Sequence, residues 1–235
     1  MANIIGAVLR IFFYLLYHPF AWLYDLVAQT VSWGRWKAWV FSILPKIQGQ
    51  ILLEIGFGPG HLLEKLQSSG YQVYGIDESW QMCNLASTRL EQHSHHKGII
   101  IRGVCQDLPF PSSQFDTVIT TFPPEFIFNE TSVKEIYRVL KPGQEWLLIP
   151  AAWITGTRLV DKFLATLFRI TGQSPPVDMD FTPLLNFYQE CGFQIKIEWI
   201  ILQSSKVLCL RLHKSRINQN LINIQPEPEK LGDYT

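Results

Sequence analysis

Short apolar runs alternate with amphipathic stretches from residue 50 to residue 151, which predicts strands separated by helices. The runs are brief and largely apolar, as expected for strands covered on both faces. They lie at residues 50–56, 71–77, 98–104, 115–122 and 145–151. Between them, apolar residues recur every three or four positions, the period of a helix with one buried face. These stretches are residues 61–70, 78–93 and 132–140.

Residues that favour helix ends support this division. Pro59 suits the start of the first helix and Gly70 its end. Ser79 is a suitable N-cap for the second helix, and Ser132 with Glu135 has the spacing of a capping box for the third. The helix boundaries therefore agree with the apolar periodicity.

The last third of the chain predicts a hairpin on the edge of the sheet. Residues 156–171 form an amphipathic helix with its apolar stripe toward the core, and residues 183–192 form a helix that ends at glycine. Two strands follow, at 193–202 and 206–213, close enough to pair antiparallel. We therefore predict an α/β fold with a doubly wound, mostly parallel seven-stranded sheet and an antiparallel edge hairpin.

The first 46 residues differ from the rest of the chain. Residues 4–28 are almost uncharged, and Trp33, Trp36 and Trp39 are spaced to share one side of a helix next to basic residues. This pattern suits a helix lying in the plane of a membrane surface, with contact through residues 1–40, and equally an apolar cap over the protein's own pocket. Arg10 and the His18-Pro19 pair interrupt the run that a spanning helix needs. We expect a helical segment at 1–46, a main domain at 47–215 and a flexible tail at 216–235.

Composition excludes two broad classes of protein. The chain has 235 residues, 47% of them apolar, with 20 Lys and Arg against 20 Asp and Glu. Such a chain is neither intrinsically disordered nor basic enough for a general nucleic-acid binder. Its four scattered cysteines indicate reduced thiols in an intracellular protein, either cytoplasmic or attached to the inner face of the membrane. We expect no metal site, because His93, His95 and His96 lie in a polar loop without carboxylates at ligand spacing.

The candidate chemistry lies where the first two strands end. Residues 54–60 read Glu-Ile-Gly-Phe-Gly-Pro-Gly, and Asp77 ends the second strand. The glycines allow a ligand to approach the backbone, and an acid after the second strand can accept hydrogen bonds from a ribose. A dinucleotide fingerprint would need glycine or alanine where His61 stands, and Glu54 would repel a pyrophosphate. The pattern favours a nucleoside that carries an amino acid, with a nicotinamide oxidoreductase left open as an alternative.

Four segments resemble, in order and spacing, the class I S-adenosylmethionine-dependent methyltransferases. They are LLEIGFGPG, YGIDES, LPFPSSQFDTVI and YRVLKPGQEWLLIP, within residues 50–150. The chain is most similar to the branch with ubiquinone/menaquinone C-methyltransferases and bacterial phospholipid N-methyltransferases. The resemblance implies S-adenosylmethionine as cofactor. The implied cofactor-binding residues are Gly56, Phe57, Gly58 and Gly60 at the methionine part with Glu54 supporting that loop, Asp77 at the ribose, Met82 at the adenosine, Cys105 and Gln106 at the adenine, and Thr121 and Phe122 at the methyl group.

Two departures from the family pattern concern the adenine and the acceptor. Val104 stands where the family often has an acid, and residues 122–126 do not match the loop of the quinone enzymes. Methyl transfer depends chiefly on proximity, and a general base is needed only for an acceptor with a difficult proton. Candidate bases are Glu125, His18, Tyr24 and Asp25. The apolar segments expected over the site predict a small lipophilic acceptor, such as a quinone, an isoprenoid or a phospholipid. A non-catalytic protein on the same fold remains an alternative.

Overall fold

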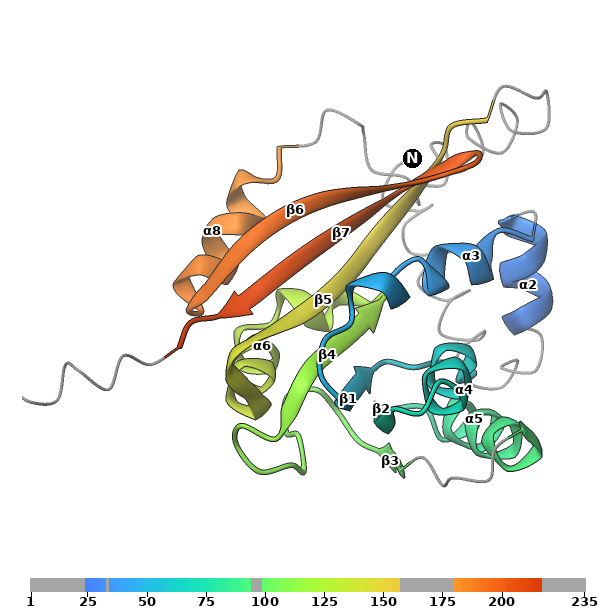
Figure 1. Cartoon of the computed structure of the whole chain (residues 1–235), viewed down its shortest axis with the longest axis horizontal. Helices are drawn as coiled ribbons and strands as arrows, with labels where there is room; N and C mark the ends of the chain where they lie inside the picture. Colours follow the sequence, from blue (N-terminus) through green and yellow to red (C-terminus); the bar gives the residue numbers. More distant parts are fainter. Residues whose placement is uncertain (1–23, 33, 94–98, 157–179, 217–235) are drawn as a thin grey trace, which may run out of the picture.

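Seven strands form one sheet, in the order β3-β2-β1-β4-β5-β7-β6 (Figure 1). The computed structural model describes residues 24–32, 34–93, 99–156 and 180–216. The strands are β1 Ile51–Ile55, β2 Gln72–Asp77, β3 Ile99–Arg102, β4 Phe115–Thr121, β5 Leu140–Ile154, β6 Phe193–Leu202 and β7 Ser205–Lys214. The first five are parallel, and β7 runs antiparallel to both β5 and β6. The predicted sheet and edge hairpin are confirmed.

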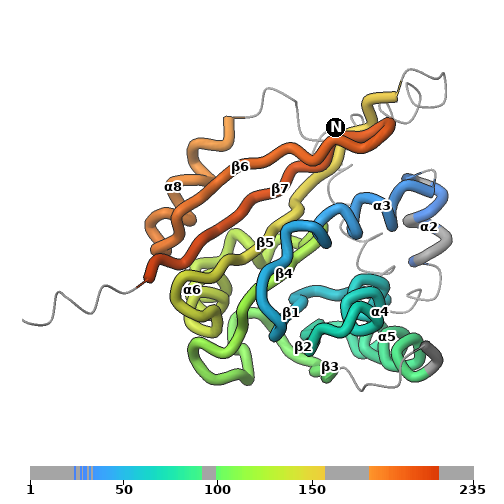
Figure 2. The backbone as a smooth tube through the Cα atoms, viewed as in Figure 1, coloured from blue at the N-terminus to red at the C-terminus, as the bar shows by residue number. Residues whose placement is uncertain are grey.

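Helices cover both faces of this sheet (Figure 2). One face packs against α3 Trp36–Phe41, α4 His61–Ser68 and α5 Trp80–His93, and the other against α6 Glu130–Val139 and α8 Thr182–Glu190. Neighbouring strand residues divide between the two cores: Leu52 faces the α3–α5 layer and Leu53 faces the α6–α8 layer, both with no exposed surface. Double coverage explains why the strand sequences read as continuous apolar runs.

Helix starts agree with the prediction at one position and differ at two. The Ser79 hydroxyl accepts a hydrogen bond from the Met82 amide at 3.2 Å, which confirms the cap of α5. The capping box at Ser132 is wrong, because α6 begins earlier and the Asn129 side chain accepts from the Ser132 amide at 3.2 Å. Helix α4 begins at His61 after a left-handed Gly60, so Pro59 lies outside it.

Strand β5 begins five residues before its predicted start. Leu140 already pairs with Phe115, and the register then shifts between Phe115 and Thr117. The irregularity accommodates Pro142 and Gly143, which a sequence pattern assigns to a turn. The strand continues to Ile154, three residues beyond the predicted end.

The N-terminal part of the described chain folds against the domain. Helix α2, Tyr24–Val31, ends before Gly34, whose φ is +76°, and α3 then leaves in a new direction. A single helix with all three tryptophans on one side is therefore wrong: Trp39 is only 2% exposed and packs in the core. The guanidinium of Arg35 donates to the Ser204 hydroxyl at 2.9 Å, which links this segment to the β6–β7 hairpin.

Several predictions fall outside the described residues. They concern the apolar run at 4–23, most of the amphipathic helix at 156–171, His95 and His96, and nearly all of the C-terminal tail. In the described part of the chain, no helix is long and apolar enough to cross a membrane.

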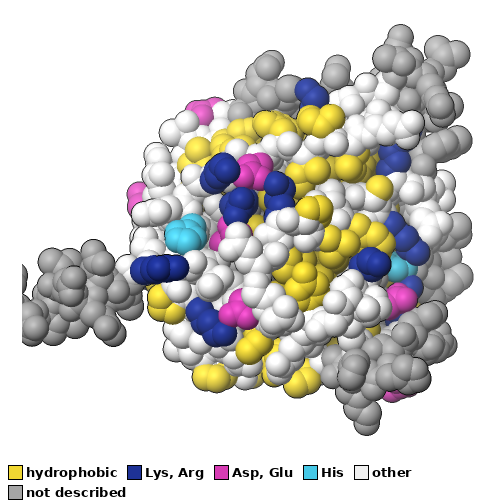
Figure 3. All heavy atoms as spheres, in the orientation of Figure 1, with side chains coloured by type: hydrophobic (Ala, Val, Ile, Leu, Met, Phe, Trp, Pro, Cys, Tyr) yellow, Lys and Arg dark blue, Asp and Glu magenta, His cyan; other side chains and the backbone are white. Residues whose placement is uncertain are grey.

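A charged network joins the N-terminal segment to the edge hairpin. The Arg211 guanidinium makes two hydrogen bonds of 2.8 Å to the Glu145 carboxylate and a third contact, at 3.3 Å, to Glu198. Lys46, in the short helix η2 (Leu44–Lys46), pairs with Glu198, as does Lys196. Acidic and basic side chains gather over β6 and β7 in Figure 3. Hydrogen bonds from the two lysines lower the pKa of Glu198 to about 2.

We predict that Glu198→Gln reduces the acid sensitivity of the fold. The pKa of Glu198 is lower in the folded than in the unfolded chain, so its stabilisation is complete above pH ~4.5 and is lost as the pH falls towards 2. Glu198→Gln should lower the free energy of unfolding at pH 7 by about 1–3 kcal/mol and flatten its decline below pH 4.5. Urea titrations from pH 7 to pH 3 measure both effects. An unchanged acid slope would contradict the prediction.

Candidate cofactor-binding site

The glycine corner, Gly56 to Gly60, follows β1 at the carboxyl edge of the sheet. Strand β1 lies between β2 and β4, where the order of the strands reverses, which is where open parallel sheets bind ligands. All three glycines have positive φ, from +55° at Gly58 to +81° at Gly60. A Cβ on Gly60 would lie 2.6 Å from the Cβ of Ala86, whereas a Cβ on Gly58 would meet nothing within 4 Å. Gly60 therefore allows α4 and α5 to pack closely, and Gly58 leaves bare backbone facing open space.

Asp77 joins the end of β2 to this corner. One carboxylate oxygen accepts from the Gly58 amide at 3.0 Å, and the other accepts from the Ser79 amide at 2.9 Å. Each carboxylate oxygen has a second lone pair, so Asp77 can hold the corner and still accept hydroxyl donors. This arrangement fits the predicted ribose contact.

Glu54 lies beneath the corner and is almost fully buried. Its side chain is 1% exposed, and its Oε2 atom has no hydrogen-bond partner among the described residues. Burial, and secondarily the negative charge of Asp77, raises the pKa of Glu54 well above its usual value. A buried carboxyl group without a partner is costly, and a cationic donor such as an ammonium group would relieve that cost. The residues present therefore fit a nucleoside with an amino-acid tail.

Aromatic rings close the side of the site next to β4. Phe122 directly follows β4 with a φ of +48°, and its ring centroid is 4.5 Å from that of Trp36 and 6.2 Å from that of Trp39. Phe126, in η3 (Glu125–Phe128), lies over the corner, since a Cβ on Gly56 would be 3.6 Å from its Cε1. The structure thus places Phe122 at the carboxyl edge, as predicted from sequence.

The residues predicted to contact adenosine differ in their accessibility. Met82 has no exposed surface and Cys105 is 5% exposed, whereas Gln106 is exposed. The Cys105 thiol donates to the Ser132 carbonyl at 3.8 Å, and burial raises its pKa to about 12, so it is a neutral thiol. Val104 is 43% exposed at the same edge. The contacts of Met82, Cys105 and Gln106 with a ligand remain predictions.

Two of the four candidate bases can be placed. Tyr24 is 8% exposed, and its ring meets Trp36 edge-on at 6.1 Å. Glu125 is exposed at the first residue of η3, three residues after Phe122. His18 and the side chain of Asp25 lie outside the described part of the chain. The role of a general base remains a prediction for all four residues.

Sequence reasoning missed the positions of Trp36 and Phe126. The spacing of the tryptophans was a genuine signal, but it fits packing on Phe122 as well as it fits a membrane surface. Phe126 belongs to the segment that departs from the quinone enzymes, where a motif comparison gives no guidance. The position of each ring beside the candidate site is evident only from the structure, in which α3 and η3 lie beside the ends of β1 and β4.

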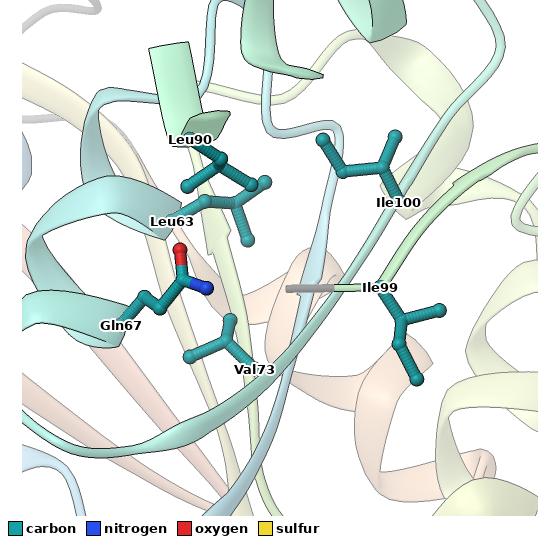
Figure 4. Close-up of a pocket in the computed structure, with 6 residues that line it drawn as sticks. All are labelled: Leu63, Gln67, Val73, Leu90, Ile99 and Ile100. Carbon is teal, nitrogen blue, oxygen red and sulfur yellow. The ribbon is translucent and has the colours of Figure 1, made fainter. Parts of the chain in front are cut away.

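A shallow pocket elsewhere carries no comparable chemistry (Figure 4). It is lined by Leu63, Gln67, Val73, Leu90, Ile99 and Ile100. Val73 and Ile99 lie near the starts of β2 and β3, so the pocket is at the amino edge of the sheet, opposite the glycine corner. Five of its six lining side chains are aliphatic, and this surface offers no acid, base or nucleophile.

The comparisons with known proteins agree with this geometry. Residues 53–148 match the family model described as "Methyltransferase domain". A Bacillus subtilis protein described as the uncharacterized methyltransferase YdaC is 34% identical over 124 residues, which cover 51% of this chain and 65% of that protein. The chloroplastic 2-phytyl-1,4-beta-naphthoquinone methyltransferase of Arabidopsis thaliana is 34% identical over 140 residues, covering 55% of this chain and 53% of that protein.

Solved structures show the same fold. Phosphoethanolamine N-methyltransferase 2 of Haemonchus contortus, in complex with S-adenosyl-L-methionine, superposes with a TM-score of 0.57 at 17% identity, covering 78% of this chain and 53% of that one. The chain spans about half to two thirds of the length of the curated relatives described above. Residues 53–148 thus match a methyltransferase domain, and the chain has the fold of S-adenosylmethionine-dependent methyltransferases.

Proposed function

We propose that the protein transfers a methyl group from S-adenosylmethionine to a small lipophilic acceptor at or near a membrane surface. The observation that carries the proposal is the buried Glu54 carboxyl beneath an open glycine corner, because its Oε2 atom has no hydrogen-bond partner among the described residues. The ammonium group of a methionine tail would stabilise the ionised form of this carboxyl, whereas a pyrophosphate would make its ionisation still less favourable. The family match over residues 53–148 agrees with this choice of cofactor and gives no support to the oxidoreductase alternative.

Different residues of the site would bind different parts of the cofactor. Glu54 would receive the ammonium group, Gly58 would let the tail approach the backbone, and Asp77 would accept from the ribose hydroxyls. When bound, S-adenosylmethionine supplies a methyl group whose bond to the sulfonium sulfur breaks as its bond to the acceptor's nucleophilic atom forms. Holding the acceptor in line accounts for much of the rate acceleration. An acceptor that loses a proton would pass it to Tyr24, Glu125, His18 or Asp25, or to water.

The lipophilic acceptor is supported by the chain itself and by two relatives. The apolar run at 4–28 precedes a segment that packs beside the carboxyl edge of the sheet. The named acceptors of similar proteins include a naphthoquinone and demethylmenaquinone. A lipophilic acceptor would be taken from a membrane, and an apolar run next to basic residues suits attachment at its surface. Location in the cytoplasm, at the inner face of the membrane, follows as part of this proposal.

The activity can be tested by transfer of tritiated methyl groups from S-adenosylmethionine into quinone and lipid extracts. We expect the tritium label in an organic-soluble product. The variant Asp77→Ala should weaken the binding of S-adenosylhomocysteine about 10- to 100-fold, because the ribose hydroxyls would lose their hydrogen bonds to a charged carboxylate. Asp116→Asn is the matched control: Asp116 binds the Gln50 and Ile51 amides at the amino edge, so this change should affect stability alone. Binding without transfer to any extract would favour the non-catalytic alternative.

Glu54→Gln should stabilise the empty protein and weaken cofactor binding. The folded pKa of Glu54 is raised, so its carboxyl costs stability increasingly as the pH rises above the unfolded value. Removing that charge should increase the free energy of unfolding at pH 7.5 by about 1 kcal/mol and weaken binding at least tenfold. Glu145→Gln, at a buried carboxylate paired with Arg211, should destabilise instead. Urea titration and calorimetry measure these effects, and equal signs for the two variants would contradict the assignment.

Attachment to membranes can be tested by introducing two negative charges into the apolar run at residues 4–28. Phe12→Glu with Phe13→Glu should reduce co-sedimentation with phosphatidylglycerol vesicles at least fivefold, because two carboxylates oppose burial at an anionic surface. Binding of S-adenosylhomocysteine is the control and should be unchanged. Co-sedimentation equal to that of the unaltered protein would show that this run does not mediate attachment.

A further inference from the structure

Phe122 is held in a backbone conformation that its side chain disfavours. Its φ is +48°, and among described residues other than glycine only the exposed Ser113, at +57°, also has a positive φ. A left-handed conformation is unfavourable for a non-glycine residue and persists only where its surroundings enforce it. Here the Phe122 amide donates to the Ile149 carbonyl at 2.7 Å, and two prolines follow. Such strain at the end of a strand beside a ligand site points to a role for the ring.

The ring is directed towards the N-terminal segment. It packs against Trp36 at 4.5 Å with an interplanar angle of 37°, and Tyr24 meets the far side of this pair edge-on. Trp36 is itself fixed, because its amide donates to the Ser32 hydroxyl at 2.9 Å and α3 is anchored by the buried Trp39. Trp36 and Phe122 nevertheless remain partly exposed. The two partners are thus rigid and still offer aromatic surface.

The position of the Trp36–Phe122 pair relative to the glycine corner determines which part of a bound ligand the pair can contact. Strands β1 and β4 are neighbours, with Glu54 paired to Ile119, so Phe122 lies one strand across from the corner. Asp77, which would hold the ribose, lies on the opposite side of β1. The Trp36–Phe122 pair is therefore on the side of the corner away from the ribose, where an acceptor would enter.

We infer that Trp36 and Phe122 form the acceptor-binding wall, and that this wall selects an acceptor with a planar conjugated ring. The inference rests on the proposed function and narrows it to one substrate class. Flat rings stack on aromatic side chains with a favourable offset geometry, whereas alkyl chains gain only burial. The left-handed backbone at Phe122 aims its ring, and the packing of α3 supplies the second ring. Both residues are positioning residues, since neither needs to exchange a proton or a covalent bond.

Binding of 2-methyl-1,4-naphthoquinone to the protein saturated with S-adenosylhomocysteine tests the wall directly. Phe122→Gly removes the ring but suits the left-handed backbone, so it should fold, and Trp36→Leu removes the second ring while keeping apolar bulk. We expect saturable binding to the unaltered protein, weakened at least tenfold in each variant, and Trp36→Leu should change S-adenosylhomocysteine affinity less than twofold. Phe122→Tyr should bind within threefold of the unaltered protein. Trp199→Leu, at an exposed tryptophan on β6, is the matched control and should have no effect.

The outcomes separate this inference from the proposed function. Naphthoquinone binding that is absent from the unaltered protein, or is unchanged by Phe122→Gly and Trp36→Leu, would overturn the wall while leaving the methyltransferase proposal standing. Saturable binding of lysophosphatidylethanolamine in place of the naphthoquinone would also overturn it. Failure of the unaltered protein to bind S-adenosylhomocysteine would instead contradict the proposed function itself. With an acceptor that is methylated, Phe122→Gly should raise KM at least tenfold and change kcat less than threefold.

Discussion

The candidate site depends on a buried carboxyl group, Glu54, whose Oε2 atom accepts no hydrogen bond from the described part of the chain. Glu54 is enclosed at the end of β1, and Asp77 next to it makes ionisation still less favourable. An apolar residue there would fit the doubly covered sheet at lower cost. The arrangement is therefore best understood as preparation for a cationic ligand, because the same low-polarity surroundings that penalise the lone carboxyl strengthen its attraction to an ammonium group.

Two other parts of the site lie on either side of β1, the strand that carries Glu54. Asp77, which holds the glycine corner, is on the β2 side, and the Trp36–Phe122 pair is on the β4 side. Asp77 anchors the corner from β2 through the Gly58 amide, while Phe122 extends from β4 towards Trp36. In the proposed function, binding of the cofactor and selection of the acceptor would therefore depend on different strands. The charged network from Lys46 through Glu198 to Arg211 fixes the segment that supplies Trp36, so the acceptor side depends on contacts with the far edge of the sheet.

The parts predicted well from sequence are those that depend on local periodicity or strand order. Buried parallel strands leave continuous apolar runs, and the positions of Glu54 and Asp77 follow because both end such runs. Helix boundaries were less certain where two residues could serve the same role: Asn129 caps α6 although Ser132 has equally suitable chemistry. The start of β5 was missed because pairing with Phe115 overrides the turn preference of Pro142 and Gly143. Trp36 could not be placed, since its spacing fits both a membrane surface and a partner 86 positions later in the sequence.

The most direct test of the central claim is the proton balance of cofactor binding, measured by calorimetry with S-adenosylhomocysteine in buffers of different ionisation enthalpy. Burial raises the pKa of Glu54 in the empty site, and a bound ammonium group would lower it again because the positive charge favours the ionised carboxylate. We predict proton release on binding that diminishes as the pH rises through the pKa of the empty site. Tight binding with no exchange of protons at any pH from 5 to 9 would contradict the role assigned to Glu54.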